Sequence, residues 1–146
     1  MDFELFNTYS NKTELFIPLD DNDIRIYACG PTVYDYIHVG NARPLIIFDV
    51  LVRFLKLIYP KVTYVRNITD VDDKIIVQAN QNKESINNLT ERTIKAFSDD
   101  ADALFVKKPD FEPRATEHIQ EMLKMIKVLL ESGNAYLSYG HVLFSV

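Results

Sequence analysis

The stretch from residue 24 to residue 44, IRIYACGPTVYDYIHVGNARP, constrains the fold more than any other part of the chain. Apolar and polar side chains alternate over residues 24–28, as in a half-buried strand. The pattern stops at Cys29-Gly30-Pro31, and after a polar, aromatic turn Pro44 opens a strongly apolar segment. A strand, a phosphate-sized loop and a helix N-terminus therefore follow one another.

Residues 45–58 form a nearly continuous apolar run that predicts a helix. Its polar interruptions, Asp49, Arg53 and Lys56, are spaced by four and three residues and so share one helical face. We expect most of this helix to be buried, with these polar residues forming a narrow solvent-exposed face. Pro44 suits the first helical turn, where its missing N–H costs nothing.

A second strand, Val62 to Val65, follows the helix and completes a βαβ unit. Such units have parallel strands and a right-handed crossover. Sheets of this type bind ligands beyond the carboxyl ends of their strands. Because residues 29–41 and 67–74 both follow strand ends, the sequence predicts an α/β fold with one crevice formed by these two segments.

The remaining sequence predicts helices and a terminal hairpin. The expected elements are an irregular lead-in at 1–23, one or two helices at 75–104 broken near 80–82, a turn between Pro109 and Pro113, a helix at about 114–131 capped by Gly133, and a β-hairpin formed by 135–138 and 141–146.

Composition narrows the class of protein. The chain has 146 residues, a net charge of −5 and no block of Lys and Arg, so non-specific binding to a phosphate backbone is not encoded. A single cysteine excludes an internal disulfide and favours a reducing compartment. We find no signal peptide and no apolar run of about 18 residues, so we expect a cytoplasmic protein without a membrane span.

Two groups of residues are candidates for chemistry. His38, Gly40 and Asn41 lie at the helix entrance, where Gly40 permits close approach, free N–H groups favour an anion and His38 can donate to a phosphate oxygen. Taken alone, these residues are also consistent with an ordinary turn that has no role in catalysis. Cys29 is either a small buried apolar residue or a reactive or metal-binding thiol, although zinc needs about four ligands. The acidic segment 69–74 fails as a calcium loop because Ile75 stands where a glycine is required.

Two blocks, CGPTVYDYIHVGNARPLIIFDVL and YVRNITDVDDKII, closely resemble the catalytic domain of cysteinyl-tRNA synthetases, which are class I aminoacyl-tRNA synthetases. The resemblance continues through RATEHI and residues 140–144 and covers essentially the whole chain. It implies a Rossmann-type (HUP-like) parallel sheet. Residues 1–80 would form the first half of that catalytic domain, and residues 81–146 would continue into the connective insertion.

The resemblance also implies the roles of particular residues. His38, Gly40 and Asn41 occupy the HIGH signature, which holds ATP with its Mg²⁺ and steadies the α-phosphate. The residues implied in ATP binding are Pro31, Thr32, His38, Gly40 and Asn41, and those implied in amino-acid binding are Cys29, Gly30, Thr32 and Thr69. Cys29 matches the first zinc ligand of the family, in which zinc binds the thiolate of the substrate L-cysteine and so discriminates against serine.

The family's other zinc ligands, its KMSKS loop and its anticodon-binding region have no counterpart within these residues. We therefore expect an N-terminal, monomeric fragment of a ligase for cysteine and cysteine tRNA that is inactive alone. Two alternatives stay open: a related cysteine ligase with an amino-sugar acceptor, and a non-catalytic module that binds a nucleotide or cysteine.

Overall fold

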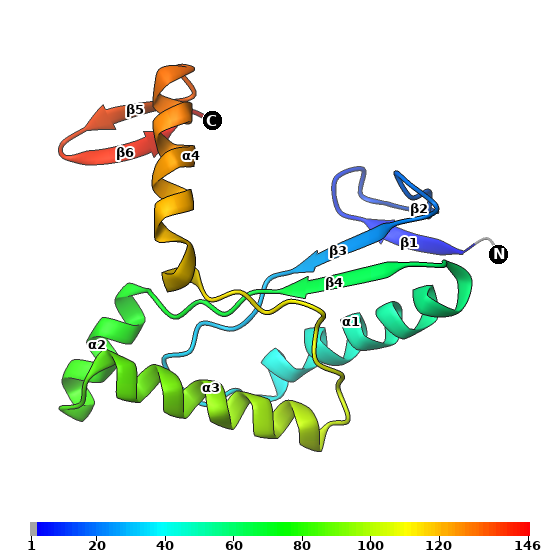
Figure 1. The fold of residues 1–146 in the computed structure, drawn as a ribbon, viewed down its shortest axis with the longest axis horizontal. Coiled ribbons are helices and arrows are strands. Elements are labelled where there is room, and N and C mark those ends of the chain that lie inside the picture. Colours follow the sequence, from blue (N-terminus) through cyan, green and yellow to red (C-terminus); the bar gives the residue numbers. More distant parts are fainter. Residues whose placement is uncertain (1–2) are drawn as a thin grey trace.

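The structure is a computed structural model and describes residues 3–146. The described residues form three two-stranded sheets and four α-helices (Figure 1). In chain order the elements are β1 (Glu4–Asn7), β2 (Lys12–Leu15), β3 (Ile24–Ala28), α1 (Val39–Ile58), β4 (Val62–Arg66), α2 (Asp73–Asn82), α3 (Ile86–Ala103), the 3₁₀ turn η1 (Ala115–His118), α4 (Ile119–Glu131), β5 (Ala135–Ser138) and β6 (His141–Phe144).

The predicted βαβ unit is present. Strands β3 and β4 pair in parallel, with Ile24 opposite Val62 and Ala28 opposite Arg66, and α1 connects them. The expected turn between Pro109 and Pro113 is wrong, because this segment runs parallel to β4 with bridges from Val65 to Phe111 and from Ile68 to Arg114. The segment lies at the outer edge of the pair, where a proline, which lacks an N–H group, is tolerated.

Helix α1 differs from its prediction in two ways. It begins at Val39, so Pro44 lies inside the helix rather than in its first turn. Its buried residues are only Leu45, Val52 and Leu55, while Leu57 is 85% exposed. The expectation of a mostly buried helix is therefore wrong, because the two-stranded sheet covers only one face of α1 and leaves other apolar positions at the surface.

The expected irregular lead-in is also wrong, because β1 and β2 form an antiparallel hairpin. Phe3 and Phe16 stack with ring centroids 4.9 Å apart, and Phe54 of α1 meets Phe3 edge to face. Asn11 takes the left-handed conformation in the connecting turn, which suits this residue type. The hairpin thus packs on the C-terminal half of α1.

The second half of the chain follows its predictions more closely. The helical region breaks between α2 and α3, where Lys83 adopts a left-handed conformation and caps α2. Figure 1 shows α4 and the β5–β6 hairpin projecting from the body that contains α1, α2 and α3. Gly133 has a φ of 76° at the end of α4, as expected for a C-terminal glycine. No residue of α4 is buried, so its broad apolar face is uncovered in the described part of the chain.

Candidate functional site

The loops that follow β3 and β4 are joined by hydrogen bonds. The Asn67 Oδ1 atom accepts a hydrogen bond from the Gly30 amide at 2.9 Å. The Thr69 amide donates to the Pro31 carbonyl at 3.0 Å, and the Val33 amide donates to the Thr69 carbonyl at 3.1 Å. Parallel pairing thus continues past the strand ends and fixes the positions of both loops.

Gly30 permits the close approach of these loops. A Cβ at this position would overlap the Asn67 carbonyl oxygen and would lie 2.8 Å from the carbonyl carbon and 3.2 Å from Cγ of Arg66. Only glycine therefore fits here without a movement of the backbone. The consequence is that Cys29, one residue earlier, is held at the rim of the sheet with its side chain exposed.

His38 caps the N-terminus of α1. Its Nδ1 atom accepts a hydrogen bond from the Gly40 amide at 3.0 Å, and Asn41 Oδ1 accepts one from the His38 amide at 3.1 Å. Because Nδ1 is the acceptor, neutral His38 carries its proton on Nε2. The imidazole is exposed, so this N–H group is a donor at the helix entrance.

The cap also explains the glycine in the pattern and corrects one expectation. A Cβ on Gly40 would lie 2.7 Å from Cε1 of His38, so a larger residue would displace the imidazole. The amides of Gly40 and Asn41 are not free, because they donate to His38 Nδ1 and to the His38 carbonyl oxygen. An anion near this helix would therefore be attracted chiefly by the helix dipole and by Nε2 of His38.

Cations from α2 and α3 hold the aromatic turn before α1. Lys74 Nζ lies 5.5 Å from the ring centroid of Tyr34, and Cζ of Arg92 lies 5.7 Å from that of Tyr36. Arg92 also donates to the Tyr36 hydroxyl at 3.3 Å and to Glu84 at 2.8 Å. The bond with Tyr36, followed by that with Glu84, raises the pKa of Arg92 above its ordinary value. The loop that carries His38 is thus connected to both helices.

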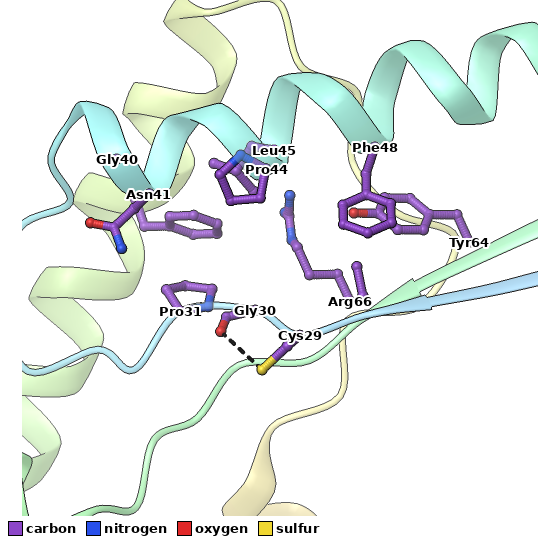
Figure 2. A pocket seen from close by; sticks show the side chains of 12 residues that line it. Cys29, Gly30, Pro31, Gly40, Asn41, Pro44, Leu45, Phe48, Tyr64 and Arg66 are labelled. Atoms are coloured by element: carbon purple, nitrogen blue, oxygen red, sulfur yellow. Dashed lines mark hydrogen bonds between the residues drawn. The ribbon is translucent and has the colours of Figure 1, made fainter. Parts of the chain in front are cut away.

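A pocket of about 100 Å³ lies between the β3 loop and the first turns of α1 (Figure 2). Of the predicted site residues, it is lined by Cys29, Gly30, Pro31, Gly40 and Asn41. The structure therefore brings the thiol-bearing loop and the helix N-terminus together.

Three other predicted site residues lie outside the lining of this pocket. His38 is exposed beside it at the helix cap. Thr32 and Thr69 are opposite one another in the parallel bridge between the two loops. Their backbones hold the loops together, and Thr69 Oγ1 accepts a hydrogen bond from Asn67 Nδ2 at 3.1 Å.

Several residues of this region carry no clear signal in the sequence. Arg66 and Phe97 line the pocket, with Cζ of Arg66 lying 4.9 Å from the ring centroid of Phe97. Asp70 belongs to the segment that fails as a calcium loop, and its buried carboxylate accepts hydrogen bonds from the Thr116 amide and hydroxyl at 2.9 and 2.6 Å. A charged residue that ends an apolar strand is the one local signal that could have identified Arg66.

Cys29 presents an exposed thiol, the type of ligand that soft metals prefer. Its hydrogen-bond contact is a long one of 3.7 Å to the Gly30 carbonyl. No group of three or more His, Cys, Asp or Glu side chains in residues 3–146 is arranged to hold a metal ion. Within this range the chain offers a single soft ligand and not a closed site.

Comparison with known proteins identifies the family. The family model described as "tRNA synthetases class I (C) catalytic domain" matches residues 15–146. The chain belongs to this family. It is 54% identical to a cysteine–tRNA ligase of Gluconobacter oxydans over 97% of its length, and 54% identical to one of Rhodospirillum centenum over its whole length. It spans 31% and 32% of these two relatives, or about a third of each.

A solved structure supports the fold assignment of this class I chain. Mycobacterium tuberculosis methionyl-tRNA synthetase, in complex with methionyl-adenylate, superposes with a TM-score of 0.73. The superposition covers 80% of this chain and 23% of the other, with 20% sequence identity. The predicted Rossmann-type α/β fold is confirmed. Each helix within residues 3–146 is too short or too polar to span a membrane.

Proposed function

We propose that the protein containing this chain is a cytoplasmic, monomeric cysteine–tRNA ligase. It would activate L-cysteine with ATP to cysteinyl-adenylate and transfer the cysteine to the 3′ end of cysteine tRNA. The observation that carries this proposal is the pocket in which the Cys29 loop meets Gly40 and Asn41 of α1. Family membership and the two cysteine–tRNA ligases at 54% identity support the same function.

The N-terminus of α1 would receive the nucleotide. The helix dipole and the Nε2–H group of His38 favour the phosphates of ATP, which enters with its Mg²⁺. As the cysteine carboxylate attacks the α-phosphate and pyrophosphate leaves, negative charge accumulates on the phosphate oxygens. A donor fixed by the helix cap stabilises that charge without reorganisation.

The loop after β3 would receive the amino acid. Cys29, Gly30, Thr32 and Thr69 lie on the two joined loops and would surround the substrate. Zinc, when bound, would take one ligand from Cys29 and would provide a soft partner for the substrate thiolate, which an oxygen-containing serine matches poorly. Residues 3–146 contribute the loop that orients this ligand through the hydrogen bond between Gly30 and Asn67.

Cysteine-dependent exchange of pyrophosphate with ATP tests the proposal in the protein that contains this chain. We expect exchange with cysteine and none with serine. The His38→Asn variant should lose about 10²-fold in rate, because asparagine can still cap the helix but does not place an N–H group where Nε2 lies. The matched control is His118→Asn, since His118 is the N-cap of α4 but makes no side-chain cap hydrogen bond.

The absence of cysteine-dependent exchange in the unaltered protein would contradict the proposal. Where exchange is observed, supplying cysteine tRNA and an amino sugar together identifies the acceptor of the adenylate. Transfer to the sugar alone would favour the related ligase. Binding of ATP or cysteine without exchange would favour a non-catalytic module.

A further inference from the structure

Arg66 is the last residue of β4, and its side chain is only 4% exposed. Its Nε and Nη2 atoms both donate to Oε1 of Glu112, at 3.1 and 2.5 Å. The Cζ atom of Arg66 also lies 4.9 Å from the centroid of the Phe97 ring. Its Nη1 atom is buried and has no hydrogen-bond partner among residues 3–146.

An unpaired donor on a buried cation is unfavourable, so Nη1 of Arg66 calls for a physical explanation. The position of Arg66 indicates what its free N–H group could bind. Figure 2 shows Arg66 rising from the end of β4 toward Pro44 and Leu45, inside the pocket that Cys29 and Asn41 also line. The guanidinium therefore lies between the loop assigned to the amino acid and the helix end assigned to the nucleotide.

The size and charge of the pocket limit what the guanidinium can bind. A volume of about 100 Å³ is well below the roughly 300 Å³ of a site for a whole ligand. The pocket therefore admits one small group. Glu112 is 35% exposed, so water screens its carboxylate more than the buried guanidinium. The pocket side of Arg66 thus retains positive potential and suits an oxyanion.

We propose that Arg66 Nη1 donates a hydrogen bond to an oxyanion where the two substrates meet, either the carboxylate of cysteine or the α-phosphate of ATP. Glu112 and Phe97 hold the guanidinium in position. During adenylate formation a carboxylate oxygen bonds to the α-phosphorus while the bond to the pyrophosphate oxygen breaks. Arg66 keeps its protons throughout. This inference rests on the proposed function.

The Arg66→Lys variant of the protein that contains this chain tests the inference by calorimetry. Lysine keeps the charge, but its single ammonium group cannot serve both Glu112 and the pocket in the geometry of a guanidinium. Two ligand pairs are compared: L-cysteine with cysteamine, which lacks the carboxylate, and AMP with adenosine, which lacks the phosphate. Each affinity ratio compares ligands on one folded protein, so a smaller folded fraction affects both members equally.

If Arg66 holds the carboxylate, the preference for cysteine over cysteamine should fall about tenfold in Arg66→Lys, with the nucleotide ratio unchanged. If it holds the phosphate, the preference for AMP over adenosine should fall instead. The control is Arg53→Lys, because Arg53 pairs with Asp49 outside this pocket. That variant should leave both ratios unchanged.

A second variant covers the case in which Arg66→Lys does not fold. Glu112→Gln keeps the guanidinium but weakens its anchor, so it should lower the same ratio to a smaller extent. Unchanged ratios in the variants that fold would overturn the inference, even if cysteine-dependent exchange is normal. Absence of exchange in the unaltered protein would instead contradict the proposed function.

Discussion

Replacement of Gly30 by alanine should open the connection between the two loops of the site. The new Cβ would overlap the Asn67 carbonyl oxygen, which belongs to the backbone and cannot rotate away as a side chain can. The loops must therefore separate. This change tests whether the close approach at Gly30 is what fixes the position of Cys29.

Three hydrogen bonds depend on this approach. They are Gly30 N to Asn67 Oδ1, Thr69 N to the Pro31 carbonyl and Val33 N to the Thr69 carbonyl. At about 1 kcal/mol each, their loss would cost about 3 kcal/mol in local stability. Since a factor of ten corresponds to about 1.4 kcal/mol, the amides of Val33 and Thr69 should exchange with solvent about 10²-fold faster.

Native-state amide hydrogen exchange measures this effect directly. Gly133→Ala is the matched control, because a Cβ there meets nothing within 4 Å while its φ of 76° imposes strain of about 1–2 kcal/mol. The control should leave exchange at Val33 and Thr69 unchanged. Unaltered protection of these two amides in Gly30→Ala would refute the reasoning, as would an equal effect of Gly133→Ala.

Three further predictions concern the helix cap, a buried carboxylate and acid stability. Gly40→Ala places a Cβ 2.7 Å from Cε1 of the capping imidazole, His38. The rate of cysteine-dependent ATP–pyrophosphate exchange should therefore fall about 10²-fold, and an unchanged rate would disprove the need for a glycine beside this cap. Thr116→Val removes the hydroxyl that donates to Asp70 at 2.6 Å; urea unfolding should show a loss of about 2 kcal/mol that Thr116→Ser does not show. The hydrogen bond from Arg114 lowers the pKa of Glu91 below its ordinary value of 4.5. The stabilisation that ionised Glu91 provides is therefore complete above pH 4.5 and is lost as the pH falls through the lowered pKa. The melting temperature of Glu91→Gln should depend less on acid pH than that of the unaltered protein, and an equal dependence would contradict this role of Glu91.

The βαβ unit was predictable because its signals are local. Alternation over residues 24–28 and the apolar run over 45–58 each specify an element without reference to distant residues. The start of α1 was not predictable in the same way. Pro44 is the usual signal for a first turn, whereas the actual cap is the His38 imidazole, which is outside the preferred capping residues.

Which residues are buried and which distant segments pair could not be predicted from the sequence, for a different reason. The apolar pattern of α1 shows which residues could be buried, but only the arrangement of the sheet shows which face is covered. The strands β1 and β2 have both faces exposed, so no alternation marks them. Arg66 has its partner Glu112 46 residues later, and no local pattern reveals that pairing.

The geometry of the site depends on side chains that bind backbone atoms rather than on secondary structure alone. Asn67 holds the amide of Gly30, and His38 holds the amide of Gly40. Each bond places one wall of the pocket, and each lies next to a glycine that a Cβ would obstruct. Substitutions at these four positions should therefore alter the distance between the thiol of Cys29 and the helix N-terminus before they unfold the chain. Activity should be more sensitive than stability at this site, because small displacements of reacting groups cost large factors in rate.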